Sequence, residues 1–163
     1  DSWLTAHNYR TAPVTMDADD WEWAPPYDDA VAHGDAPRQL RLKQSYLAHT
    51  QSILEWDRRA AHILFGRDIA YVILLHATRL NADCMDELAA MLRREHLRVV
   101  SLDKAMRDPA YQSADTYSDK NGMVWLGRWA YTRKIALPWA TVEKVPAWVQ
   151  EEYDRADDDR PGR

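Results

Sequence analysis

The stretch Gly66–Asn81, GRDIAYVILLHATRLN, decides the expected fold. Its turn, Gly66–Asp68, leads into an almost entirely apolar run, Ile69–Leu75, that ends at His76. A short apolar run rich in β-branched residues, entered from a glycine turn, is typical of a strand buried on both faces. Sites in α/β folds gather beyond the carboxyl ends of strands, so His76 is the first candidate for chemistry.

The flanking sequence predicts helices and further strands around this run. Leucine and alanine recur every seven residues from Leu40 to Ala61, which predicts an amphipathic helix over about Pro37–Phe65, capped by Asp35 and ended by Gly66. Strand Ile69–Leu75, helix Ala82–Glu95 and strand Leu97–Leu102 would form a parallel βαβ unit. The other expected elements are a weak strand at Tyr9–Met16, short helices at Pro25–His33 and Asp103–Arg107, and a last helix from Pro146 through Tyr153.

Composition limits the function classes. The chain has 163 residues, 46% of them hydrophobic, which is enough for one domain with a real core. Its net charge of −5 gives no electrostatic support for binding nucleic acid. The single cysteine, Cys84, excludes an internal disulfide and a cysteine-based metal site, and no apolar run has the length of a membrane span.

Two features could act together in chemistry: the acidic cluster Asp17–Trp21 and His76 at the strand end. An imidazole can donate or accept a proton near neutral pH, and a carboxylate bonded to its other nitrogen would fix its tautomer. The competing interpretation of His76 is a core histidine bonded to backbone, and spacing alone does not separate the two. The competing interpretation of Asp17–Asp20 is an ordinary acidic turn.

Other residues carry a weaker signal. No two histidines are three or four residues apart, so no helical histidine pair that could bind a metal is present. Asn81 and Arg79 could line a pocket, although capping of the helix explains Asn81 better. Trp125, Arg128 and Trp129 could form a platform for a sugar, but core packing explains them more simply.

Taken in order, these pieces resemble the C-terminal half of a polysaccharide deacetylase of the NodB type, from a bacterial branch. The segment YRTAPVTMDADDW, Tyr9–Trp21, is similar to the family's fourth motif, an Asp-Trp pair after a strand. Leu74-Leu75-His76 is similar to its fifth motif, Leu-x-His. The runs VVSLDKAMRDPAY and WLGRW extend the similarity, which covers roughly Tyr9–Trp129.

The resemblance implies an α/β fold that is part of a distorted (β/α) barrel, its C-terminal half, with the parallel βαβ unit and the long helix. Residues 1–110 would form the half-barrel, and residues 111–163 a tryptophan-rich extension packed on it with a frayed acidic end. The family hydrolyses acetyl groups on sugars with a divalent metal, zinc being the expected ion. The resemblance also implies an exported enzyme, secreted or periplasmic. The composition, with one cysteine, is equally compatible with a cytoplasmic protein.

The resemblance further implies a role for each matching residue. His76 would be the general acid that protonates the leaving amine, and Asp20 would orient it and tune its charge. Trp21 and Leu74 would wall a small pocket for the acetyl methyl group. The Asp20 carboxylate should therefore lie within hydrogen-bond reach of His76, with Trp21 and Leu74 flanking the same hollow.

The family's motifs for the general base and for the metal have no counterpart in this sequence. These are an Asp-Asp pair, a His-x-x-x-His pair and an arginine-rich third motif. We therefore expect no metal ligand set in this chain, and no deacetylation without a missing N-terminal half or a second chain. Alternatives are a non-catalytic carbohydrate-binding domain and a subunit that completes another chain's barrel. The expected partners are a carbohydrate and that missing half, without nucleic acid or a membrane span.

Overall fold

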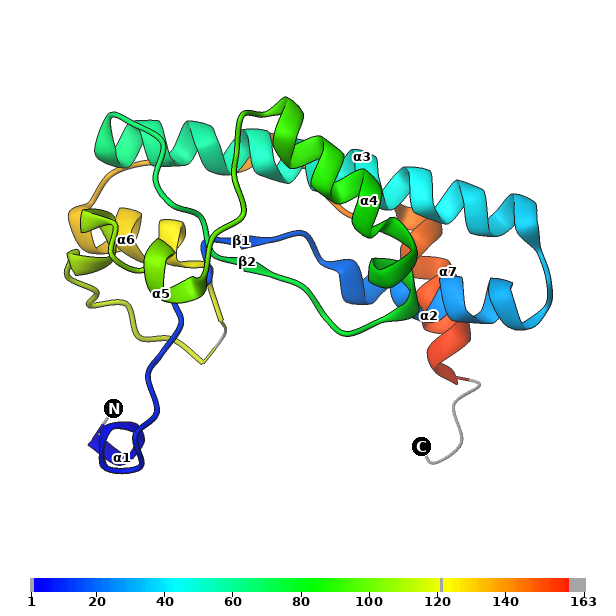
Figure 1. Ribbon diagram of the computed structural model, residues 1–163, viewed down its shortest axis with the longest axis horizontal. Helices are drawn as coiled ribbons and strands as arrows, with labels where there is room; N and C mark the ends of the chain where they lie inside the picture. The colour runs from blue at the N-terminus through cyan, green and yellow to red at the C-terminus, as the bar shows by residue number, and fades with distance from the viewer. Residues whose placement is uncertain (1, 121, 159–163) are drawn as a thin grey trace.

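Helices, and not strands, build most of this protein. The computed structural model describes residues 2–120 and 122–158, with 61% of residues in helices and 3% in strands (Figure 1). The elements are α1 (Ser2–Ala6), β1 (Met16–Asp17), α2 (Asp20–Ala32), α3 (Ala36–Phe65), β2 (Ile73–Leu74), α4 (Arg79–Arg94), α5 (Leu102–Ala105), η1 (Pro109–Gln112), α6 (Trp125–Arg133), η2 (Trp139–Thr141) and α7 (Ala147–Asp158).

The prediction of an α/β fold that forms half of a (β/α) barrel is therefore wrong. In the described residues the sheet has two parallel strands, β1 and β2, in which Met16 pairs with Ile73 and Asp17 with Leu74. Residues 97–102 form no strand, so the predicted βαβ unit lacks its second strand. The run Ile69–Leu75 is also not buried on both faces, because Leu74 and Leu75 are 36% and 38% exposed.

The long helix α3 is the spine of the molecule and agrees with the prediction. Asp35 caps its start by accepting a hydrogen bond from the backbone N–H of Arg38, and Gly66 ends it in the left-handed conformation with φ of 71°. Figure 1 shows α3 running along the length of the protein, with α2, α4 and α6 packed along it and α1 lying apart from it.

Apolar side chains of α3 take part in three groups of buried residues along this spine. Near its start, α3 packs with α2, α4 and α7, and near its end with α6 and the segment around Ile69. Between them, Ile53 and Leu54 of α3 pack on Met16 of β1 and on Ala18, which follows β1. Helices α6 and α7, which follow residue 110, thus contact the rest of the chain at the two ends of α3, and the boundary at residue 110 remains a prediction. The expected frayed end is residues 157–163, of which residues 157–158 belong to α7 and residues 159–163 lie outside the described residues.

The two short strands matter because they place the chemistry. The backbone N–H groups of Thr15 and Met16 donate to the carbonyl of Val72, and the Thr15 hydroxyl accepts from the Val72 N–H. These bonds fix the register of two segments that are far apart in the sequence. The chain leaving β1 toward α2 therefore runs beside the chain leaving β2 toward His76.

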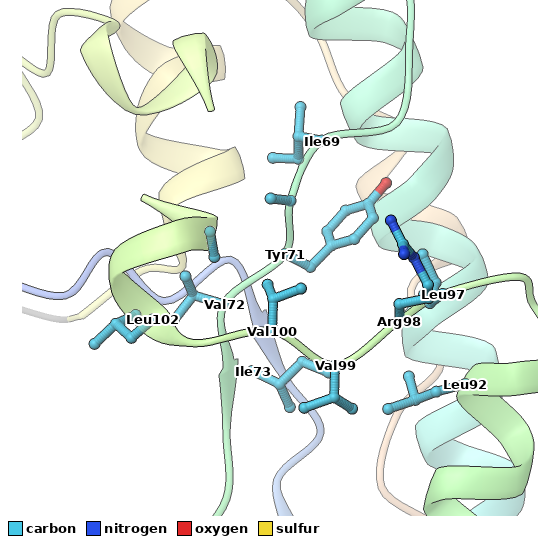
Figure 2. A pocket seen from close by; sticks show the side chains of 12 residues that line it. Ile69, Tyr71, Val72, Ile73, Leu92, Leu97, Arg98, Val99, Val100 and Leu102 are labelled. Atoms are coloured by element: carbon cyan, nitrogen blue, oxygen red, sulfur yellow. The ribbon is translucent and has the colours of Figure 1, made fainter. Parts of the chain in front are cut away.

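An apolar hollow of about 280 Å³ separates the segment after α3 from the segment after α4. Figure 2 shows Ile69, Tyr71 and Val72 on one side and Val99 and Val100 on the other. Val99 is 82% exposed, although the sequence predicts it in a strand. Residues 97–100 carry the β-branched composition of a strand but lie apart from β2.

Candidate active site

The turn after β1 and the segment after β2 bring Asp20 and His76 together. Asp19 adopts a left-handed backbone with φ of 51°, which turns the chain so that α2 begins at Asp20. The Asp20 carboxylate is 1% exposed, whereas the His76 side chain is 46% exposed. A buried carboxylate thus holds a histidine whose ring reaches the surface.

The Asp20 carboxylate accepts hydrogen bonds from two groups of His76. One oxygen lies 2.6 Å from Nδ1 of the ring, and the other lies 2.8 Å from the backbone nitrogen. An ionised carboxylate only accepts hydrogen bonds, so Nδ1 carries the proton in this pair. The expected contact between these residues is present. It leaves Nε2 as the ring nitrogen that can exchange a proton with a bound molecule.

Asn81 completes this arrangement, although the sequence analysis explained it better as the cap of a helix. Its side-chain amide donates to the Asp20 carboxylate and, at 2.8 Å, to the His76 carbonyl. The Tyr46 hydroxyl donates to the Asn81 side-chain oxygen at 2.7 Å. The cap of α4 is Thr78, whose hydroxyl accepts from the Asn81 backbone N–H. Thr78, three positions before Asn81, is also a favoured N-cap residue. Choosing Thr78 as the cap would have made the Asn81 side chain a candidate for the site.

An open hollow of about 470 Å³ adjoins the exposed ring of His76. Trp21 lines it, as expected, but Leu74 is not among its lining residues. The sequence analysis missed the other five lining residues, among them Asp28 of α2 and Tyr153 of α7. The complete lining is Trp21, Ala24, Pro25, Asp28, His76, Thr78 and Tyr153. The hollow is wider and more polar than a pocket for a single methyl group.

Carboxyl groups behind this pair are held away from water. Burial raises the pKa of Asp17, and the hydrogen bond that its carboxylate accepts from the Asp19 backbone N–H opposes this rise in part. Burial also raises the pKa of Glu22. Both ring nitrogens of His49 and one Glu22 oxygen are buried without a hydrogen-bond partner among the described residues. The interior behind the site thus contains acidic groups, and some of its buried polar atoms have no hydrogen-bond partner among the described residues.

These residues do not fit a divalent metal. Within residues 2–120 and 122–158, no group of three or more His, Cys, Asp or Glu side chains could hold a metal ion. Both carboxylate oxygens of Asp20 are occupied by His76 and Asn81. We therefore derive no chemical step through a metal held by this chain.

Comparison with known proteins returns no relative. No protein family, no curated protein and no solved structure matches the chain. In the described part of the chain, no helix has both the length and the apolar character needed to cross a bilayer. The molecule is thus defined by its own features: a helical protein with a strand-end Asp–His pair beside an open aromatic hollow.

Proposed function

We propose that this chain contributes the proton-donating side of a carbohydrate deacetylase, an enzyme that hydrolyses acetyl groups on sugar residues. The observation that carries the proposal is the 2.6 Å contact between the exposed ring of His76 and the buried carboxylate of Asp20. The motif similarity of Tyr9–Trp21 and Leu74–His76 supports it. The catalytic metal of such an enzyme would supply an activated water, and its ligands would lie on polypeptide outside these residues.

In this proposal each residue of the pair has a separate task. His76 protonated on Nε2 gives that proton to the amine or alkoxide that leaves as the acetyl group is cleaved. Asp20 holds Nδ1–H, fixes the orientation of the ring and stabilises its positive charge. Asn81 is a positioning residue, because it holds Asp20 and the His76 carbonyl in place. Trp21 forms a wall of the hollow in which the sugar lies.

The partners follow from the same chemistry. The substrate is a carbohydrate, and a preceding half of the polypeptide or a second chain contributes the metal ligands and the general base. Nucleic acid is not a partner in this proposal, because the net charge of −5 opposes binding to phosphate.

The test is acetyl release from acetylated sugar polymers by the polypeptide that contains this sequence, with zinc supplied. We expect His76→Ala to lower kcat about 10²–10⁴-fold, as loss of a general acid does. Asp20→Asn should lower kcat with little change in KM. His62→Ala, at an exposed histidine of α3, is the matched control and should keep full activity. Full activity of His76→Ala, or no acetyl release from any such polymer, would contradict the proposal.

A non-catalytic carbohydrate-binding protein is the second candidate. It is favoured by the aromatic side chains of Trp21 and Tyr153 in an open hollow and by the lack of a metal-binding group in the described residues. This candidate predicts that the polypeptide binds sugar oligomers but releases no acetate. The acetyl-release assay therefore separates the two candidates.

A further inference from the structure

We propose that the hollow beside His76 selects oligosaccharides that carry a free, positively charged amino group, and that Asp28 is the residue that recognises it. The inference rests on the proposed function and specifies the substrate class of the same site. The substrate would be an amino-sugar polymer from which some acetyl groups have already been removed.

The aromatic wall of the hollow suits a sugar ring. Trp21 is 40% exposed, and its ring meets the Tyr153 ring edge to face, with centroids 5.3 Å apart and an interplanar angle of 88°. Such a pair presents rigid apolar surface next to groups that hydrogen-bond. The C–H face of a pyranose can lie on this surface while its hydroxyl groups point to water.

Helix α2 places Asp28 in the same hollow but away from His76. Trp21, Ala24, Pro25 and Asp28 follow the i, i+3, i+4, i+7 spacing of one helical face. Asp20 binds His76 at the first residue of α2, and Asp28 lies eight residues further on, about 12 Å along the axis. Asp28 would therefore meet a ring next to the one that reacts at His76.

The Asp28 carboxylate keeps its capacity to accept hydrogen bonds. Its side chain is 58% exposed, and its ion-pair partner is Arg79, with Nε and Oδ1 3.9 Å apart. That distance is too long for a hydrogen bond, so Arg79 neutralises the charge in part without occupying the oxygens. The Asp20 carboxylate, in contrast, is buried and already accepts from His76 and Asn81.

A free amino group on a sugar is protonated at mildly acidic pH and would pair with such a carboxylate. The acetylated nitrogen of the same sugar is neutral and would gain nothing from that charge. Each acetyl group removed would thus create a group that the hollow prefers on the neighbouring ring. We infer that the enzyme acts next to units that it has already deacetylated.

The test measures binding by the chain with two probes at pH 6 and low salt. One is the fully acetylated tetramer of N-acetylglucosamine, and the other is the same tetramer with a single free amino group. We expect the amine-bearing tetramer to bind about three- to fivefold more tightly, the size typical of an exposed ion pair. Raising the salt to about 0.5 M should remove most of this preference.

Three variants test the role of Asp28. Asp28→Asn should abolish the preference, by weakening binding of the amine-bearing tetramer to the level of the fully acetylated one. Arg79→Ala should increase the preference, because it removes the competing cation. Asp86→Asn, at an exposed aspartate of α4, is the matched control and should behave as the unmodified protein does.

Four results would overturn the inference: equal affinity for the two probes, no binding of either, equal loss of both in Asp28→Asn, or an unchanged preference in Asp28→Asn. Equal affinity for the two probes would not contradict the proposed function, because that function is tested by acetyl release that depends on His76. A preference that persists without any acetyl release would contradict the proposed function alone.

Discussion

Asp57 is a buried carboxyl group whose charge the fold disfavours. It lies on α3, is 2% exposed, and one of its oxygens has no hydrogen-bond partner among the described residues. Burial, with a smaller effect of the nearby Asp17, raises the pKa of Asp57 to about 8 from the ordinary 3.8. The folded state therefore holds a proton on Asp57 that the unfolded state releases above pH 4.

This difference predicts that stability falls as the pH rises. Because the folded pKa lies above the unfolded one, the full stability is present below about pH 4 and is lost progressively up to about pH 8. Asp57→Asn should remove this loss and raise the free energy of unfolding at pH 8 by several kcal/mol relative to the unmodified protein. Urea unfolding at pH 5 and pH 8 measures it, with Asp86→Asn as the control. The same pH dependence in Asp57→Asn as in the unmodified protein would refute the argument.

At the same scale, the sequence predicted part of the site. His76 and Asp20 were found because an ionisable group after an apolar run and a motif-like Asp-Trp pair are both visible along the chain. Asn81, Asp28 and Tyr153 were missed because their importance depends on which elements meet in space. Asn81 has a local explanation as a helix cap, and only the structure shows that its side chain binds Asp20 instead.

Two helix ends show the same backbone conformation with different residues. Gly66 after α3 and His96 after α4 both have positive φ, 71° and 59°. At the end of α4 the N–H of His96 donates to the Arg93 carbonyl and that of Leu97 to the Leu92 carbonyl, the pattern of a Schellman motif. A side chain at this position costs energy that glycine avoids.

Exchanging these residues should move stability in opposite directions. His96→Gly should stabilise the protein by roughly 0.5–1 kcal/mol, because it relieves the left-handed strain of a residue that has a Cβ. Gly66→Ala should destabilise it by about 1 kcal/mol through the same strain, since an added Cβ meets nothing within 4 Å. Urea midpoints of both variants measure this. A destabilised His96→Gly variant would contradict the assignment of strain.

At the scale of elements, helices were predicted better than strands. The helix α3 agrees with its predicted range because capping and periodicity are local properties. The run Ile69–Leu75 forms a strand only at β2, and residues 97–102 form none, because a strand exists only where another strand pairs with it. The barrel prediction depended on such pairing and failed with it.

At the scale of the whole molecule, the apolar hollow between residues 69–73 and 97–102 leaves apolar side chains exposed to solvent. Val99, Val100 and Leu102 expose 82%, 38% and 46% of their surface. No hydrogen bond of the described chain engages the backbone N–H groups of residues 98–100. An exposed apolar segment with open backbone groups promotes association with other chains.

We therefore expect the isolated chain to self-associate as its concentration rises. Val99→Lys should shift the sedimentation profile toward the monomer, because a charge on the segment opposes edge-to-edge pairing. Met85→Lys, at a 48% exposed methionine of α4, is the control for added charge and should change little. Association that is equal in all three proteins would contradict this view.

The position of Tyr153 in α7 also has a consequence for biosynthesis. Trp21, Asp20 and His76 leave the ribosome before Tyr153, the second aromatic side chain of the hollow. A chain that ends before α7 would contain both residues of the Asp–His pair but would leave the hollow without Tyr153. Loss of α7 would thus remove one wall of the hollow while both residues of the proposed proton-transfer pair are still present.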